Sequence, residues 1–311
     1  MKLKHIATAA IALALSAAAS AQRVPVRFSD VYSPEVPASV TICSETIPLD
    51  RSDMYEAFDR ELSSIVYTHG TTMLIIKRAN RFFPEMSRIL RDNGVPQDML
   101  YLACVESSLN PRAYSPAKAA GFWQFIPSTA REYGLEVGDE VDERYNIEKA
   151  TAAACRYLKN SYRRFGNWPS VMAAYNGGNT RITNELDRQG QETSLDLYLT
   201  EETTRYPYRI MAMKTVMENP SAYGFHLRDD QLYQPRRYRE VEVSGPVASW
   251  PDWARRQGIS YATLRDENPW IRSKSLTNRA GKTYKVRIPT AESLSRSQSG
   301  TDTFNSNWTD R

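Results

Sequence analysis

The 311-residue sequence is poor in the residues that build most metal and redox sites. It has only three histidines and three cysteines. So few histidines argue against a histidine-based metal site or catalytic triad, and the cysteines show no metal-type spacing. We therefore predict no metal site and no metal or organic cofactor.

The sequence also lacks blocks of like charge and, beyond its first residues, long hydrophobic runs. Its 40 basic residues nearly offset 36 acidic ones, which leaves a formal net charge of +4. This excess is too small to indicate a nucleic-acid partner, although it suits an anionic polymer or surface. No stretch after residue 21 is long and apolar enough to predict a membrane-spanning helix.

Residues 1–21 have the three parts of a secretory signal peptide. Lys2 and Lys4 come first, an apolar run follows over residues 6–15, and small residues end at Ala21. The alternative is a membrane anchor, but the apolar run is much shorter than the ~20 residues that a bilayer needs. We expect cleavage before Gln22, export of the chain, and no integral membrane segment afterwards. No cysteine follows the cleavage site to carry a lipid, since Cys43 lies far downstream.

Export would permit disulfides, yet an odd number of cysteines leaves at least one unpaired. Cys104 and Cys155 both lie among apolar residues with helical spacing. A buried free thiol is the usual state at such positions. We therefore expect free thiols, with a Cys104–Cys155 disulfide as the alternative.

Hydrophobic spacing divides the rest of the chain. Residues 22–52 are proline-rich without helical register and are predicted to be a linker. Two apolar stripes over residues 53–95 predict an N-terminal helical extension. Further helices are expected at 96–107, 147–165, 169–175 and 206–218. No alternating strand pattern occurs before about residue 230, so residues 96–230 should form an all-helical domain.

The pattern changes after Pro235. Val241 and Val243 alternate with acidic residues, and Val286 and Ile288 with basic ones, which predicts two strands. Two short helical stretches lie between them. The fold class is therefore mainly α, with a small α+β module of β-α-α-β order at residues 236–290. Residues 291–311 have few core formers, so we predict a disordered tail.

The helix that begins near Pro96 places a carboxylate on its apolar face. Met99, Leu102 and Ala103 share one face, and Glu106 continues it seven residues after Met99. Burial and the nearby helix C-terminus both disfavour negative charge, so the pKa of Glu106 should be raised. A glutamate of this kind can act as a general acid near neutral pH. The alternative is a frayed helix end with Glu106 in solvent.

The segment after Glu106 is rich in turn formers and aromatic residues. Gly121 would let the backbone approach a ligand closely. Phe122, Trp123 and Phe125 suit either a hydrophobic core or the stacking of sugar rings. Gln124 offers an amide that can donate to and accept from sugar substituents.

At this point the chain resembles the Slt-type lytic transglycosylases, in particular the membrane-bound lytic transglycosylase D group. Three ordered motif blocks carry the resemblance: E-S-x-x-N-P-x-A-x-S with A-x-G-x-x-Q and P-x-T-A, then A-Y-N-x-G, then E-T-x-x-Y. They stand here as Glu106, Ser107, Asn110, Pro111, Ala113, Ser115, Ala119, Gly121, Gln124, Pro127, Thr129 and Ala130, as Ala174, Tyr175, Asn176 and Gly178, and as Glu202, Thr203 and Tyr206. Asp142, Glu143 and Arg144 match a further stretch of the group. One departure is Lys118, where many members have glycine or asparagine.

The resemblance implies a lysozyme-like catalytic domain at residues 96–230 and a single catalytic carboxylate. Such an enzyme cleaves the β-1,4 bond between N-acetylmuramic acid and N-acetylglucosamine in peptidoglycan and leaves 1,6-anhydromuramic ends. Glu106 is carried over as acid and base, and the glycan cleft as Ser115, Gln124, Tyr175, Asn176 and Tyr206. For the tyrosines, core packing is the alternative, and Asn176 with the two following glycines could simply end a helix. The implied partners are peptidoglycan glycan strands. The implied location is the periplasm, with peripheral attachment to the outer membrane or cell wall left open.

Two other functions compete with this one. A hydrolytic muramidase of goose-lysozyme type shares the fold and would need a second carboxylate to position water, for which Asp139, Asp142 or Glu143 are candidates. A non-catalytic peptidoglycan-binding protein would keep the fold with an inactive site.

The C-terminal module resembles LysM, which binds glycans that contain N-acetylglucosamine. The supporting residues are Gly258, Ile259, Ser260, Leu264, Asn268, Pro269, Leu276, Gly281 and the closing segment 286–289. The usual G-D-T-L opening is replaced here by SGPVAS before Trp250. That loop helps to form the sugar groove in the family, so the departure affects the expected binding more than the expected fold.

Overall fold

A computed structural model describes residues 31–297 and 302–310 of the chain. The chain divides into two units, residues 1–33 and 34–311, and all elements below belong to the second. The predicted signal peptide lies outside the described residues. Among the residues that are described, no helix is both long and apolar enough to cross a membrane.

The predicted N-terminal helices are confirmed as α1, Ser52–Tyr67, and α2, His69–Asp92. Each buries the apolar stripe that the spacing indicated, including Phe58 and Leu62 on α1 and Phe83 and Met86 on α2. The helix α1 packs along α8, Glu201–Glu218, which lies about 150 residues later in the sequence.

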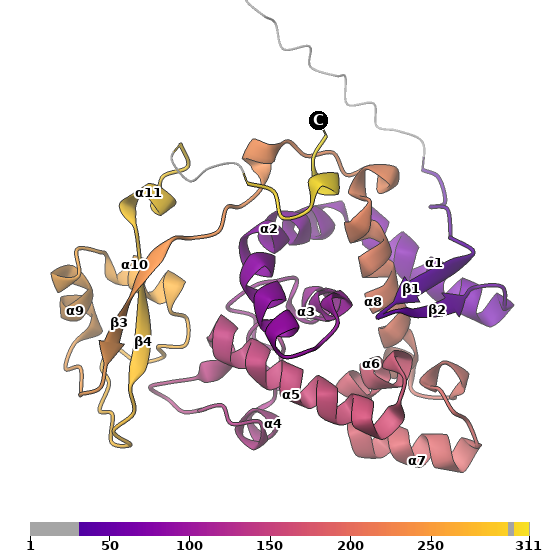
Figure 1. The fold of residues 1–311 in the computed structure, drawn as a ribbon, viewed down its shortest axis with the longest axis horizontal. Helices are drawn as coiled ribbons and strands as arrows, with labels where there is room; N and C mark the ends of the chain where they lie inside the picture. Colours follow the sequence, from indigo (N-terminus) through magenta and orange to yellow (C-terminus); the bar gives the residue numbers. More distant parts are fainter. Residues whose placement is uncertain (1–30, 298–301, 311) are drawn as a thin grey trace, which may run out of the picture. The chain divides into compact units, whose positions relative to one another are not determined.

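A short central helix lies among the longer ones (Figure 1). It is α3, Leu100–Ser107, preceded by a 3-10 turn at Gln97–Met99, and it contacts both α2 and α8. The other helices of this region are α4, Pro127–Glu132, α5, Ile147–Phe165, α6, Trp168–Gly177, and α7, Asn179–Gln189. The spacing predicted α3, α5, α6 and α8, but it did not indicate α4 or α7.

The predicted β-α-α-β module is also confirmed. It consists of β3, Tyr238–Val243, α9, Trp250–Arg256, α10, Tyr261–Glu267, and β4, Tyr284–Pro289. The two strands are antiparallel, with Val241 opposite Val286. Their core extends into the preceding domain, because Ala120, Val141 and Tyr145 belong to the same buried cluster.

The predicted linker at residues 22–52 is wrong in its second half. An antiparallel hairpin forms there from β1, Ser39–Ile42, and β2, Glu45–Pro48. Val40, Ile42 and Ile47 are buried, so alternate side chains of the hairpin anchor it to the helical core. The surrounding prolines conceal this two-residue period in the sequence.

The predicted disordered tail is wrong for the residues that the structure describes. A short helix, α11, covers Ala291–Leu294, and a 3-10 turn covers Ser306–Trp308. Trp308 is 1% exposed and lies 5.8 Å from the Phe83 ring, centroid to centroid. Its indole Nε1 donates to the Met217 carbonyl at 2.6 Å. A single tryptophan in a polar segment thus docks the tail on α2 and α8.

All three cysteines are free thiols, and Cys104 and Cys155 are buried. The expectation of free buried thiols is confirmed, and the alternative Cys104–Cys155 disulfide is not formed. Burial raises the pKa of the Cys155 thiol to about 11, so it stays protonated at neutral pH.

Candidate active site

Glu106 lies in the last turn of α3, on the face that the helical period predicts. Met99, Leu102 and Ala103 of that face are fully buried, whereas Glu106 is partly exposed. The helix ends because Ser108 adopts a left-handed conformation with φ of +50°. A carboxyl group in this position borders the core and still reaches solvent.

The carboxyl group of Glu106 is held by a tyrosine from α8. Tyr206 Oη donates a hydrogen bond to Glu106 Oε1, and the Tyr206 side chain is 3% exposed. Burial raises the pKa of Glu106 to about 7, and the negative charge of Glu202 contributes in the same direction. The Tyr206 hydrogen bond and the positive charge of Arg209 lower that pKa. A carboxyl with a pKa near 7 can donate and accept a proton at neutral pH.

Arg209 is itself fixed by a buried carboxylate on α1. Its Nε donates to Glu61 Oε2 at 2.9 Å, and Glu61, which is 1% exposed, also accepts from Arg205. Neither Arg209 nor Glu61 was predicted as a site residue from the sequence. Glu61 lies three residues after Phe58 on the buried stripe of α1, so the pattern that identified Glu106 could also have found it.

Tyr175 of α6 lies beside this group, but its hydroxyl has a structural partner. Tyr175 Oη donates to the Trp123 carbonyl at 2.7 Å. Burial raises the pKa of Tyr175 well above its usual value, and the charge of Glu106 contributes. Tyr175 therefore packs against the core, as the alternative to a cleft role predicts, and its side chain lies near the Glu106 carboxyl.

Asn176 joins the second motif block to the third. Its Oδ1 accepts from Thr203 Oγ1 at 2.8 Å, and its Nδ2 donates to Glu202 Oε1 at 3.3 Å. The neighbouring Gly177 packs closely, since a Cβ there would lie 3.0 Å from Thr203 Cγ2 and the threonine side chain would have to shift slightly. The contacts of Asn176 thus place Glu202 near Glu106, where its charge affects the Glu106 pKa.

Ser115 and Gln124 stabilise the loop between α3 and α4. Ser115 Oγ accepts from the Ala119 amide at 3.1 Å, and Gln124 Nε2 donates to the Gly121 carbonyl at 2.8 Å. Among the described residues, 31–297 and 302–310, neither side chain forms a hydrogen bond with Glu106. The structure therefore brings Tyr206 and Tyr175 close to Glu106, joins Asn176 to Glu202 and Thr203, and gives Ser115 and Gln124 loop-forming contacts.

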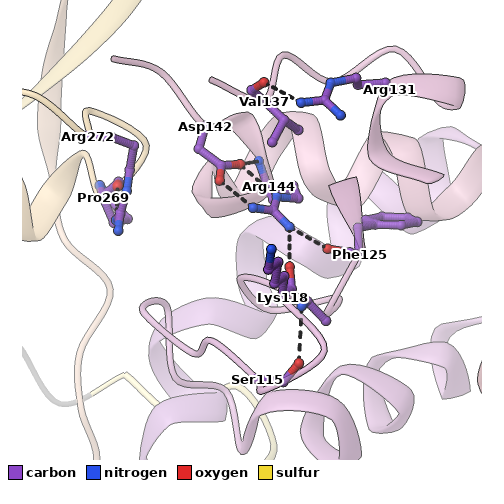
Figure 2. A network of polar contacts seen from close by, with 10 residues as sticks. Ser115, Lys118, Phe125, Arg131, Val137, Asp142, Arg144, Pro269 and Arg272 are labelled. Carbon is purple, nitrogen blue, oxygen red and sulfur yellow. Dashed lines mark hydrogen bonds and ion pairs between the residues drawn. The ribbon is translucent and has the colours of Figure 1, made fainter. Parts of the chain in front are cut away.

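A buried arginine holds this loop in place (Figure 2). Arg144 forms a bidentate ion pair with Asp142, at 2.9 Å and 2.6 Å. Its Nη1 donates to the carbonyls of Lys118 and Phe125 at 2.6 Å and 3.0 Å. The sequence predicted Asp142 and Arg144 as part of a motif stretch, and Asp142 also as a candidate for a hydrolytic mechanism. Their role in holding the loop follows from contacts that the sequence alone does not reveal.

Two loop positions have conformations that explain their residue types. Gly121 has φ of +75°, and a Cβ there would lie 2.0 Å from the Arg144 carbonyl oxygen. The close approach is therefore to the protein's own backbone, which corrects the prediction of approach to a ligand. Lys118 has φ of +62°, the region that glycine and asparagine favour, which accounts for those residues in other family members.

The three aromatic residues of the loop belong to the core. Phe122, Trp123 and Phe125 are at most 4% exposed, and Trp123 Nε1 donates to Thr151 Oγ1 at 2.9 Å. Of the two alternatives for these residues, core packing is correct, and no sugar ring could stack on them without a rearrangement.

Two of the three carboxylates considered for a hydrolytic mechanism, Asp142 and Glu143, have other partners. Both oxygens of Asp142 accept from Arg144. Glu143 accepts from the Glu136 amide at 2.8 Å and from Lys149. Asp139 is exposed. Among the described residues, no second carboxylate forms a hydrogen bond with Glu106. Glu202 acts on Glu106 only through its charge.

Comparison with known proteins agrees with these features. Residues 86–196 match the transglycosylase SLT domain, and residues 239–292 match the soluble lytic transglycosylase C-terminal LysM-like domain. Membrane-bound lytic murein transglycosylase D of Escherichia coli K12 is 31% identical over 217 residues. These residues are 68% of this chain and 46% of that protein, so the chain spans about half the length of this curated relative.

Two solved structures also match. The 70 kDa soluble lytic transglycosylase of Escherichia coli has a TM-score of 0.40 at 23% identity, over 53% of this chain and 29% of that one. An inactive mutant of the lytic transglycosylase Slt from Pseudomonas aeruginosa has a TM-score of 0.39 at 19% identity, over 53% and 28%. From the sequence matches, the chain belongs to the SLT transglycosylases through residues 86–196, carries a LysM-like C-terminal domain, and is homologous to membrane-bound lytic murein transglycosylase D.

Proposed function

We propose that this protein is a peptidoglycan lytic transglycosylase with Glu106 as its catalytic acid and base. The observation that carries the proposal is a partly buried carboxyl group with a pKa of about 7. It accepts a hydrogen bond from Tyr206 where the three motif blocks meet. The SLT match over residues 86–196 gives independent support.

The reaction needs one group that first gives and then takes a proton. Protonated Glu106 donates its proton to the glycosidic oxygen as the bond from that oxygen to C1 of N-acetylmuramic acid breaks. The C6 hydroxyl of the same sugar then attacks C1 and returns its proton to Glu106. One C–O bond breaks, another forms, and the carboxyl group is regenerated. The attack is intramolecular, so proximity supplies part of the rate.

The neighbours of Glu106 suit both halves of this cycle. Burial favours the protonated form that starts the reaction. The Tyr206 hydrogen bond and the charge of Arg209 stabilise the carboxylate that forms midway. We assign Tyr206 and Asn176 to the glycan cleft, and Tyr175 to the wall behind the carboxyl. Ser115 and Gln124 would contribute to the cleft indirectly, because their hydrogen bonds to the backbone set the shape of the loop.

A hydrolytic muramidase is the nearest alternative, and the ion pairs of Asp142 and Glu143 weigh against it. Mass spectrometry of peptidoglycan digested by the whole chain distinguishes the two. Anhydro ends, lighter than reducing ends by one water, are expected. Reducing ends alone would establish hydrolysis, and binding to sacculi without any cleavage would establish a non-catalytic binding protein.

We further propose that the protein acts after export, in the periplasm. The charged start, short apolar run and small residues of segment 1–21 support this. Cell fractionation with N-terminal sequencing should find a mature chain that begins at Gln22 in the periplasmic fraction. An uncleaved chain in the cytoplasmic fraction would contradict it.

The LysM-like module offers a second place to bind the same polymer. Residues 243–249, which include the unusual SGPVAS loop, line a cavity of about 510 Å³ with Asp252, Trp253 and Arg256. We propose that this cavity takes N-acetylglucosamine units. Titration of the whole chain with N-acetylglucosamine oligomers should perturb the spectroscopic signal of the Trp253 indole. If that signal is unchanged when the catalytic cleft is saturated, the module does not have this binding role.

A further inference from the structure

The helix α1, which packs along α8 (Figure 1), contributes a buried carboxylate to the surroundings of the proposed active site. Glu61 is 1% exposed and accepts hydrogen bonds from two arginines of α8. Arg209 Nε donates to Glu61 Oε2 at 2.9 Å, and Arg205 Nε donates to Glu61 Oε1. An ionised carboxylate is costly to bury unless cations neutralise it, and the two arginines do so here. Glu61 lies outside residues 86–196, so the SLT match assigns it no role.

The two arginines depend on Glu61 to different extents. Arg205 has a second carboxylate nearby, because its Nη1 lies 3.6 Å from Glu201 Oε1. Arg209 pairs with Glu61, and among the described residues its side chain forms no other ion pair or hydrogen bond. The loss of the Glu61 charge would therefore leave Arg209 without a counter-charge.

Arg209 also lies within electrostatic reach of the proposed catalytic carboxyl. It follows Tyr206 by three residues on α8, so the two side chains leave neighbouring points of one helix face. Tyr206 Oη donates to Glu106 Oε1, which places the carboxyl beside that face. Burial has the largest effect on the pKa of Glu106 and raises it, whereas the charge of Arg209 lowers it even while Arg209 is bound to Glu61. One guanidinium therefore lies between two carboxylates and is paired with the more distant one.

Other titratable and charged groups surround Glu106 and its helix α3. They are Tyr206, Glu202 and Arg209 of α8, Tyr175 of α6, Arg78 of α2, and Asp98 of the preceding 3-10 turn. Arg78 Nη1 donates to the Ser108 carbonyl at 2.9 Å, just beyond the end of α3. Asp98 lies at the opposite end of α3 from Glu106. Of the two arginines in this set, Arg209 is the one whose charge lowers the pKa of Glu106.

We propose that Glu61 is a positioning residue for catalysis, which holds Arg209 away from Glu106 so that Glu106 keeps its proton until the reaction starts. The inference rests on the proposed function of Glu106 as acid and base. A guanidinium paired directly with Glu106 would stabilise the carboxylate, which cannot protonate the glycosidic oxygen. Held by Glu61, Arg209 still lies near enough to stabilise the carboxylate that forms midway. The N-terminal helical extension thereby contributes to the electrostatics of the active site.

The test compares the whole chain with its Glu61→Gln variant. Glutamine has nearly the shape of glutamate but no charge, so it releases Arg209 from its ion pair. The pKa of Glu106 is measured by carboxyl-carbon NMR of glutamate-labelled protein, and the Glu106→Gln spectrum identifies its signal. In Glu61→Gln this pKa should fall from about 7 to about 6 or below, as expected when a cation approaches a carboxylate. The release of 1,6-anhydromuropeptides at pH 8 should fall about tenfold, because about tenfold fewer molecules carry the proton.

A double variant separates this role from a purely structural one. Arg209→Gln alone removes the cation, so the pKa of Glu106 and the alkaline limb of the pH–rate profile should rise. Adding Glu61→Gln to Arg209→Gln should move neither any further, because the freed cation is no longer there. If Glu61 only fastens α1 to α8, its loss should lower the melting temperature and should scale the rate equally at every pH, without moving the limb.

Glu56→Gln is the matched control. Glu56 is an exposed residue of α1, and its replacement removes the same charge from the same helix. This variant should keep the wild-type pKa of Glu106 and the wild-type limb. If Glu61→Gln does not fold, Glu61→Gln with Arg205→Gln is the substitute, since it also removes the second arginine that loses its partner. The substitute should show the same fall in the pKa of Glu106.

Two results would overturn the inference: an unchanged pKa of Glu106 in Glu61→Gln, or an equal fall when Glu61→Gln is added to Arg209→Gln. The NMR titration does not depend on cleavage. A chain in which the pKa falls as expected but sacculi stay uncut would refute the proposed function and keep the control of the Glu106 proton by Glu61. A chain that cuts sacculi, with the pKa of Glu106 unmoved in Glu61→Gln, would do the reverse.

Discussion

Replacing Glu106 with glutamine should stabilise the protein at neutral and alkaline pH and do so much less at acidic pH. Burial raises the pKa of Glu106 from 4.5 to about 7. The folded state therefore binds more protons than the unfolded state between these values, so its stability falls as the pH rises through this window. The pKa displacement corresponds to about 3 kcal/mol at pH 8. Glutamine carries no charge and can still accept the Tyr206 hydrogen bond.

Urea denaturation at pH 4, 6 and 8 measures this effect. The free energy of unfolding of Glu106→Gln minus that of the wild type should grow from near zero at pH 4 to about 3 kcal/mol at pH 8. Other ionisable groups are common to both proteins and cancel in the difference. Equal m values would verify that the same unfolding reaction is compared. A difference that is independent of pH, or a variant less stable than the wild type at pH 8, would refute the reasoning.

Three further substitutions test parts of the site and its support. Tyr206→Phe removes a hydrogen bond that lowers the pKa of the Glu106 carboxyl, so that pKa should rise. The alkaline limb of the pH–rate profile should therefore move to higher pH, and a limb that stays in place would contradict this. Gly121→Ala would force a Cβ against the Arg144 carbonyl and should cost about 3 kcal/mol or more in thermal unfolding. Gly166→Ala is its control, with a similar φ but open space, and should cost about 1 kcal/mol. Trp308→Ala should cost about 3 to 5 kcal/mol if the tail is docked, and a neutral effect would show that it is not.

The helical core and the position of Glu106 could be predicted because both follow from a local period. The spacing of Met99, Leu102 and Ala103 fixes one face of α3, and a carboxylate on that face must be partly desolvated. The same logic would have found Glu61 on α1. Arg209 follows Tyr206 by three residues on α8, so its side of the helix was predictable, although its target was not.

Other features could not be predicted because they depend on residues distant in the chain. The Tyr206–Glu106 bond joins positions one hundred residues apart, and the family motif assigned Tyr206 to the glycan cleft without indicating this bond. The hairpin at residues 39–48 was missed because its two short strands stand among prolines. Trp308 was missed because a lone aromatic residue has no periodic pattern. The loop roles of Ser115 and Gln124 depend on backbone turns that a motif does not reveal.

The central claim is that Glu106 performs the acid–base chemistry of glycan cleavage. The most direct measurement is the rate at which purified sacculi release 1,6-anhydromuropeptides with the wild type, Glu106→Gln and Glu132→Gln. Glu132 is an exposed carboxylate at the end of α4, outside the site, and serves as the matched control. We expect a loss of at least about a hundredfold for Glu106→Gln and an unchanged rate for Glu132→Gln. Release by Glu106→Gln at the wild-type rate would contradict it.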